Sequence, residues 1–219
     1  MNKEDIAKMI DHTLLKPDAG LEGVKKLCDE AKVFNFASVC VNPYYTQYAK
    51  QLLDGSSVKV CTVIGFPLGA TPTEIKVSEA NYCIKNGAEE IDMVINIGAV
   101  KNRDYKYVEE DVKAVVAAAK SHGSGIIVKV IIEACLLNQE EKENVITLLL
   151  NTGADFVKTS TGFSTGGATV EDIALMKKIV GNRMLIKASG GIRDLNSFMK
   201  MVSAGADRIG TSNGVTILS

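Results

Sequence analysis

Lys158 is the residue of this sequence with the clearest chemical potential. It follows the apolar residues Phe156 and Val157 and precedes a polar turn at residues 159–162. A lysine in an apolar strand costs free energy unless it is paired, uncharged or at an open end. An uncharged amine is also a nucleophile that forms a Schiff base with a carbonyl compound. The alternative interpretation is a surface lysine at a strand end, the usual environment for this residue type.

Two more lysines lie at regular intervals on either side of Lys158. Lys129 and Lys187 each lie in an apolar segment, and Asp92 lies in an earlier one. Clustered ammonium groups repel each other and burial adds to the effect, so at least one of these lysines should have a lowered pKa. Asp92 could neutralise a remaining ammonium group and transfer protons. For Lys129, the alternative is an outward side chain paired with a carboxylate on a helix.

The elements that must position these residues alternate between strand and helix. The apolar patterns predict strands at residues 11–15, 37–41, 58–64, 90–96, 126–132, 184–188 and 208–210, with a further strand that ends at Lys158. Helices are expected at residues 3–10, 21–33, 44–53, 72–86, 105–121, 139–151, 170–180 and 195–203. Continuous apolar strands suit a parallel sheet that is covered on both faces. Eight such units predict an α/β fold, a (β/α)8 TIM barrel, as a single domain over residues 1–219 rather than a doubly wound sheet.

Helix starts are marked by capping residues. The segment Thr71-Pro72-Thr73-Glu74 predicts a helix that is capped by Thr71, begins at Pro72 and has Glu74 closing a capping box. Asn138 and Thr169 are expected to cap two later helices.

The turns before the even-numbered strands predict which side chains share a layer of the barrel. A residue suited to a left-handed helix end precedes each of these strands. The same offset from each turn selects one residue per even-numbered strand, namely Cys40, Asp92, Lys158 and Gly210. Inward side chains from alternate strands share a layer. We therefore expect these four residues to lie at one level of the barrel interior.

Glycine-rich turns follow the last two predicted strands. Gly190 and Gly191 follow the seventh, and Gly210, Thr211 and Ser212 follow or end the eighth. In (β/α)8 barrels, the loops at these two positions and a short helix bind phosphate through backbone N–H groups. The alternative for either turn is ordinary helix initiation. Their position at the end of the barrel predicts a phosphate site.

Composition excludes several classes of partner. The net charge of −1 offers no electrostatic basis for binding nucleic acid or an anionic membrane, and no apolar run approaches the roughly 20 residues that span a bilayer. The five cysteines are an odd number without CxxC spacing, which favours reduced thiols in the cytoplasm. Since the chain has only two histidines, we expect no metal site.

With these motifs the sequence closely resembles the deoxyribose-phosphate aldolases, a family of class I (Schiff-base) aldolases, over nearly its whole length. The resemblance is carried by Asp11-His12-Thr13-Leu14-Leu15-Lys16-Pro17, Val63-Ile64-Gly65-Phe66-Pro67-Leu68-Gly69, Glu90-Ile91-Asp92-Met93-Val94-Ile95-Asn96, Lys129-Val130-Ile131-Ile132-Glu133, Lys158-Thr159-Ser160-Thr161-Gly162 and Lys187-Ala188-Ser189-Gly190-Gly191. The order of these segments is that of the family. Phe163 departs from the pattern, because some members carry a basic residue there.

The resemblance implies a lyase of deoxyribonucleotide catabolism. It would reversibly cleave 2-deoxy-D-ribose 5-phosphate to acetaldehyde and D-glyceraldehyde 3-phosphate, without a metal or organic cofactor. Lys158 would form the Schiff base, Lys187 would keep its amine uncharged, and Asp92 would transfer protons. The remaining candidates for contact with substrate or phosphate are Gly190, Gly191, Thr161, Gly210, Thr211, Ser212, Lys129 and Cys40. Members of the family are commonly homodimers.

Two other functions remain open at this stage. One is a phosphate-binding barrel isomerase or a Schiff-base aldolase that acts on a longer sugar phosphate, and release of acetaldehyde would distinguish it. The other is a non-catalytic barrel that binds a sugar phosphate. Such a protein should have a damaged site, whereas Lys158, Lys187 and Asp92 are all present.

Overall fold

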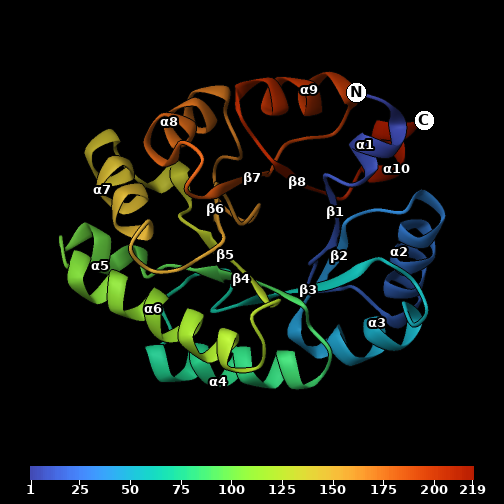
Figure 1. Cartoon of the computed structure of the whole chain (residues 1–219), viewed down its shortest axis with the longest axis horizontal. Coiled ribbons are helices and arrows are strands. Elements are labelled where there is room, and N and C mark those ends of the chain that lie inside the picture. Colours follow the sequence, from blue (N-terminus) through green and yellow to red (C-terminus); the bar gives the residue numbers. More distant parts are fainter.

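The chain folds into a closed barrel of eight parallel strands with helices around it (Figure 1). The computed structural model describes residues 1–219. Neighbouring strands in the sequence are neighbours in the barrel, and β1 pairs with β8 to close it. The strands are β1 (Ile10–Leu14), β2 (Ser38–Val41), β3 (Lys59–Ile64), β4 (Glu90–Val94), β5 (Ile127–Ile131), β6 (Phe156–Lys158), β7 (Leu185–Ser189) and β8 (Arg208–Thr211). The predicted (β/α)8 TIM barrel is therefore confirmed.

The helices form the outer layer (Figure 1). They are α1 (Lys3–Ala7), α2 (Leu21–Phe34), α3 (Thr46–Leu52), α4 (Thr73–Lys85), α5 (Ile97–Lys101), α6 (Tyr105–Ser121), α7 (Gln139–Leu149), α8 (Val170–Val180), α9 (Leu195–Ala204) and α10 (Gly214–Leu218), with the 3-10 turns η1 (Pro43–Tyr45) and η2 (Ala134–Leu136). The two chain ends meet where Lys3 Nζ donates to the Leu218 carbonyl at 2.5 Å. No helix has both the length and the apolar character needed to cross a membrane.

Apolar periodicity and capping residues predicted most helix boundaries to within one or a few residues. The bounds of α6 match the prediction, and Asn138 and Thr169 cap α7 and α8 by accepting backbone N–H bonds. The capping box predicted at Thr71 is wrong. Pro72 has an extended ψ of 152° and is itself the N-cap residue, so the helix begins one position later and no side chain caps it.

Three short elements were not expected, namely α5, η2 and α10. Each has five residues or fewer, too few to show a helical repeat of apolar positions. Two of them follow the strands that carry Asp92 and Lys129, and α10 follows β8. They lie where the loops of the barrel's carboxyl face begin.

The apolar core lies between the barrel and its helices, whereas the barrel interior is charged. In β5, Val128 and Val130 belong to the main apolar core, while Lys129 between them is fully buried and bonded to interior carboxylates. This alternation explains how a strand can be apolar towards its helices and still carry a lysine. The outward orientation considered for Lys129 is therefore wrong.

Strand register aligns the charged residues. Asp92 on β4 pairs with Lys129 on β5, and Lys158 on β6 pairs with Lys187 on β7. Because the strands are parallel and closed into a ring, residues far apart in the sequence converge at the carboxyl end of the barrel.

Candidate active site

Asp92 is the centre of a buried cluster of amines. Its Oδ2 atom lies 2.7 Å from the Nζ atoms of both Lys158 and Lys187, and its Oδ1 atom lies 2.9 Å from Lys129 Nζ. Asp92, Lys129 and Lys187 are fully buried, and Lys158 retains 3% exposure. The structure thus brings together the three lysines and the aspartate that the sequence singled out.

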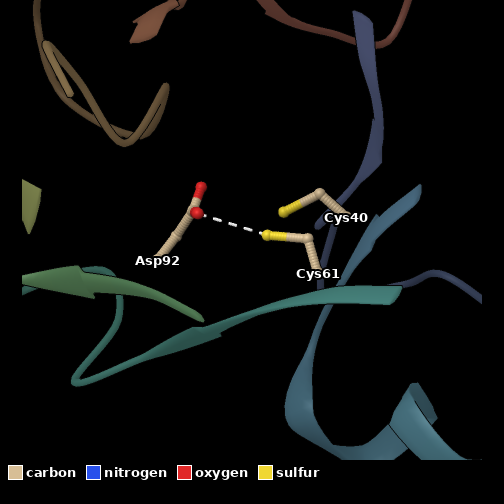
Figure 2. Close-up of side chains that lie close together, drawn as sticks. All are labelled: Cys40, Cys61 and Asp92. Carbon is tan, nitrogen blue, oxygen red and sulfur yellow. Dashed lines mark hydrogen bonds between the residues drawn. The ribbon is translucent and has the colours of Figure 1, made fainter. Parts of the chain in front are cut away.

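The residues predicted to share a layer with Asp92 and Lys158 lie beside them. Cys40 lies with Cys61 next to Asp92, and their nearest ligand atoms are all within 4.8 Å of one another (Figure 2). Cys61 Sγ lies 3.2 Å from Asp92 Oδ1. A Cβ atom on Gly210 would approach Lys187 Cε to 3.0 Å, so glycine leaves the room that this lysine occupies. Cys40 and Lys158 are therefore both neighbours of Asp92, as the single-layer prediction requires, whereas Gly210 lies beside Lys187.

A second group of charged residues, Asp11, Glu90 and Arg208, forms ion pairs with the amines or with each other. The sequence analysis did not single out these residues. Asp11 accepts from Arg208 at 2.6 Å and from Ser38 at 2.7 Å, and its other oxygen lies 2.5 Å from Lys187 Nζ. Glu90 lies 2.5 Å from Lys129 Nζ. Glu90 is two residues before Asp92, and strand alternation could have placed both on the inner face.

These contacts determine which groups are charged. Burial raises the pKa of Asp92, but Lys129, Lys158 and Lys187 outweigh it and hold that pKa well below the usual carboxyl range. Burial lowers the pKa of Lys187, but Asp11 and Asp92 reverse the effect and raise it. Lys129 behaves likewise: burial acts against its ammonium form, and Asp92 leads the groups that raise its pKa. The pKa values of Lys129 and Lys187 are therefore raised rather than lowered, because the attraction of the neighbouring carboxylates exceeds the effect of burial.

The cluster of Cys40, Cys61 and Asp92 contains ligand types that bind soft metals, but its surroundings disfavour a cation. Both carboxylate oxygens of Asp92 face ammonium groups at 2.7–2.9 Å, which would repel a metal ion. Burial, followed by the hydrogen bond with Cys40, raises the pKa of the Cys61 thiol well above its usual value. A metal binds the thiolate rather than the thiol. The charge arrangement suits proton transfer between amines instead.

A cavity of about 350 Å³ opens above the amine cluster. Of the three lysines at Asp92, only Lys158 lines it. The predicted substrate-contacting residues that line the cavity are Thr161, Gly190, Gly191, Gly210, Thr211 and Ser212. Four predicted site residues do not line the cavity, namely Lys129, Lys187, Asp92 and Cys40. They can therefore influence the reaction only through Lys158 and its neighbours.

The cavity is also lined by free backbone donors. The N–H groups of Gly190, Gly191 and Ser212 lie outside helices and strands and bond to no protein acceptor. Gly190 and Gly191 have φ angles of +88° and +81°, a conformation that glycine adopts without strain. Lys16 and Arg193 also line the cavity, are exposed, and have no carboxylate partner. These groups together can hold an anion.

Thr161 differs from these phosphate candidates. Its N–H lies 3.3 Å from both oxygens of Glu133, and its hydroxyl donates to Glu133 Oε2. Both of its donors are therefore occupied, and it has none to offer a phosphate oxygen. Phe163 packs edge-on against Phe66 with ring centroids 5.3 Å apart, so an aromatic pair fills the position where a basic side chain was considered.

Comparisons with known proteins show that the chain is similar to aldolases. The family model described as "DeoC/LacD family aldolase" matches residues 6–218. A deoxyribose-phosphate aldolase from Carboxydothermus hydrogenoformans is 59% identical over 213 residues, which are 97% of this chain and 93% of that relative. One from Thermococcus kodakarensis is 57% identical over 100% of this chain and 97% of that relative.

Solved structures give the same result. The tetrameric deoxyribose phosphate aldolase from Aeropyrum pernix is 38% identical with a TM-score of 0.92, covering 99% of this chain and 91% of that one. An aldolase designated QR15 is 41% identical with a TM-score of 0.92, covering 98% of this chain and 94% of that one.

Proposed function

Because the chain belongs to the DeoC/LacD family of aldolases, we propose that it is a class I aldolase acting through Lys158. It reversibly cleaves 2-deoxy-D-ribose 5-phosphate to acetaldehyde and D-glyceraldehyde 3-phosphate, the reaction for which its relatives are named. The observation that supports this assignment most strongly is the contact of both Lys158 and Lys187 with one carboxylate oxygen at the base of a cavity.

The other charged groups of the barrel interior pair with one another. The cations Lys129, Lys187 and Arg208 balance the carboxylates Asp11, Glu90 and Asp92 through the ion pairs described above. Lys158 also lines the cavity, so its amine is the one that a substrate carbonyl can reach.

The reaction follows from these positions. The Lys158 amine attacks the C1 aldehyde of the open-chain sugar, and loss of water gives an iminium ion. Removal of the proton from the C3 hydroxyl breaks the C2–C3 bond, which releases glyceraldehyde 3-phosphate and leaves an enamine. Protonation at C2 and hydrolysis then release acetaldehyde and restore the amine. Asp92 contacts both Lys158 and Lys187, so it can pass a proton between them.

The phosphate group would be held by the glycine-rich loops that line the cavity. Gly190, Gly191 and Ser212 offer unpaired N–H groups there, and Lys16 and Arg193 add positive charge at the rim. Backbone N–H groups at glycine-rich loops after the last strands of a barrel are a common phosphate-binding arrangement. This geometry also supports a sugar phosphate rather than an unphosphorylated aldehyde as the natural substrate.

Trapping the covalent intermediate tests the assignment. The protein is treated with acetaldehyde and borohydride, and peptide mapping should place a two-carbon adduct on Lys158. Lys158→Arg keeps the charge but removes the usable nucleophile, so both trapping and turnover should be lost while the circular dichroism spectrum is retained. An adduct on Lys129 or Lys187, or appreciable turnover by Lys158→Arg, would refute the role of Lys158. Absence of acetaldehyde release by the wild type would refute the reaction itself and favour the isomerase or the non-catalytic barrel.

We also propose that the protein is a cytoplasmic homodimer. All five cysteines are free, as expected of a reducing compartment. A groove beside α4 is lined by Pro43, Leu68, Ile75 and Tyr82, and the last three are 73%, 52% and 58% exposed. Clustered exposed apolar side chains are typical of protein interfaces. Light scattering should give twice the monomer mass, and Leu68→Asp should give the monomer if this groove forms the contact.

A further inference from the structure

Arg208 is a largely buried cation of the barrel interior that the proposed reaction does not use. It begins β8, and its side chain is 14% exposed. Its Nη1 atom donates to Asp11 Oδ1 at 2.6 Å and lies 3.3 Å from Glu90 Oε2. Its guanidinium carbon lies 5.6 Å from the centre of the Phe156 ring. A guanidinium group stays protonated in proteins, so Arg208 is a permanent positive charge beside the amine cluster.

Each carboxylate that Arg208 contacts is shared with a lysine. The second oxygen of Asp11 lies 2.5 Å from Lys187 Nζ, and Glu90 Oε2 lies 2.5 Å from Lys129 Nζ. Asp11 thus binds one cation with each oxygen, and its fully buried carboxylate cannot rotate without losing one of them. Burial acts to raise the pKa of Asp11, but Lys187, Lys129 and Arg208 hold that pKa below the usual carboxyl range. Arg208 therefore helps to keep Asp11 ionised and directed at Lys187.

Every strand of the barrel contributes a titratable or charged side chain to this interior. These side chains are Asp11 (β1), Cys40 (β2), Cys61 (β3), Glu90 and Asp92 (β4), Lys129 (β5), Lys158 (β6), Lys187 (β7) and Arg208 (β8). Lys187 is also the register partner of Arg208, so these two cations start from adjacent backbone positions. Like charges disfavour each other in a poorly hydrated interior. The permanent charge of Arg208 therefore opposes protonation of the amines near it.

We propose that Arg208 is a positioning residue that holds Asp11 and Glu90 against the lysines and sets the lowest pH at which Lys158 reacts. Without its charge, these carboxylates would face lysines alone, and protonation of each amine would become easier. Lys158 is connected to this arrangement through Asp92, whose Oδ2 atom lies 2.7 Å from the Nζ atoms of both Lys158 and Lys187. A protonated amine cannot attack a carbonyl, so loss of the charge would confine activity to higher pH. This role of Arg208 rests on the proposed function, because Lys158 is the nucleophile of that reaction.

Arg208→Gln tests the proposal, because it removes the charge and keeps a hydrogen-bond donor for Asp11. The measurement is kcat/KM for the cleavage of deoxyribose 5-phosphate as a function of pH. The acidic limb of this profile should move upward by about one pH unit, so that the rate on the limb falls about tenfold while the rate at high pH falls less. Titration of the substrate phosphate is the same for every variant and does not affect the comparison with wild type.

Three further variants separate the effect of charge from that of packing. Arg208→Lys keeps a positive charge and should retain the wild-type limb. Ser38→Ala removes a hydrogen bond of 2.7 Å to the same Asp11 oxygen without a change of charge, and it should also leave the limb in place. The double variant Arg208→Gln, Glu90→Gln loses one positive and one negative charge together, so its limb should return towards the wild-type position.

A purely structural role of Arg208 predicts an equal loss of rate at every pH, and that result in Arg208→Gln would overturn the proposal. If thermal unfolding shows that Arg208→Gln does not fold, a folded Arg208→Lys with a displaced limb would overturn it, and an unchanged limb would support it.

A wild-type protein that does not cleave the sugar phosphate would refute the proposed function instead. The effect of the charge is then measured by acetylation of Lys158 with acetic anhydride, since only the uncharged amine reacts. Peptide mapping across a pH series should show the same upward shift in Arg208→Gln, and the absence of a shift would overturn the role of Arg208.

Discussion

Asp92→Asn tests whether one carboxylate holds the buried amines together. Asparagine has nearly the same size as aspartate, but it lacks the negative charge that Lys129, Lys158 and Lys187 face at 2.7–2.9 Å. One of its two terminal atoms is also a donor, which would point at an amine. In the variant Lys129 keeps its ion pair with Glu90 and Lys187 keeps its ion pair with Asp11, but the fully buried group as a whole has excess positive charge.

The size of the effect follows from this burial. Removing one partner of a buried ion pair costs about 3–5 kcal/mol of unfolding free energy, because the remaining charge is left unpaired. For a chain of this length each kcal/mol lowers Tm by about 2–4 °C, so a fall of about 10 °C is expected. Turnover should also fall by about 10²–10⁴-fold, the usual contribution of a group that transfers protons.

The difference in unfolding free energy between wild type and Asp92→Asn should also depend on pH, which gives a second measurement. The pKa of Asp92 is lower in the folded than in the unfolded chain, because the three lysines favour its carboxylate form against the effect of burial. Its stabilisation is therefore fully present above the unfolded pKa of about 3.9 and is lost as the pH falls towards the folded pKa. The difference in unfolding free energy between wild type and Asp92→Asn should be constant from about pH 5 to pH 7 and should shrink below about pH 4.

Urea unfolding followed by circular dichroism provides the assay. Asp29→Asn is the matched control, since Asp29 is also paired with lysines but lies on the surface. Exposed pairs contribute at most about 1 kcal/mol, so this variant should unfold close to wild type. The double variant Asp92→Asn, Lys129→Met removes one ammonium group with the carboxylate and should recover part of the loss. If Asp92→Asn unfolds within about 1 kcal/mol of wild type, the reasoning on buried charge is refuted.

Three further predictions concern the other parts of the site. Lys187→Leu removes an ammonium group beside Lys158, so the rate at neutral pH should collapse and recover partly at higher pH; a pH–rate profile of unchanged shape would contradict this role. Gly190→Val places a Cβ atom 2.9 Å from Gly167 Cα at a φ of +88°, so KM for deoxyribose 5-phosphate should rise by about tenfold or more. An unchanged KM would locate the phosphate elsewhere. Activity should survive exhaustive treatment with EDTA, and loss that a divalent ion restores would contradict the Schiff-base mechanism.

The sequence by itself determined the architecture and the core of the candidate site. Alternating apolar and helical patterns predicted the barrel because strand and helix periods are local properties of a chain. Equal offsets from the turns before strands placed Asp92 and Lys158 in one layer, because strand alternation sets the inward face and barrel closure brings the strands together. Cap residues such as Asn138 and Thr169 were recognisable for the same reason, since they bond only to neighbours in the sequence.

Only the tertiary structure decided how the charges and hydrogen bonds are shared. The pKa of Lys187 is raised rather than lowered because Asp11 and Asp92 come from two other strands, β1 and β4, and together overcome the effect of burial. The N–H and the hydroxyl of Thr161 both donate hydrogen bonds to Glu133, which lies 28 residues earlier, so neither donor is free. Such outcomes depend on distances between segments that are remote in sequence. A difference of a few ångströms reverses the direction of a pKa shift or changes which group accepts a hydrogen bond. Sequence spacing does not specify distances to that precision.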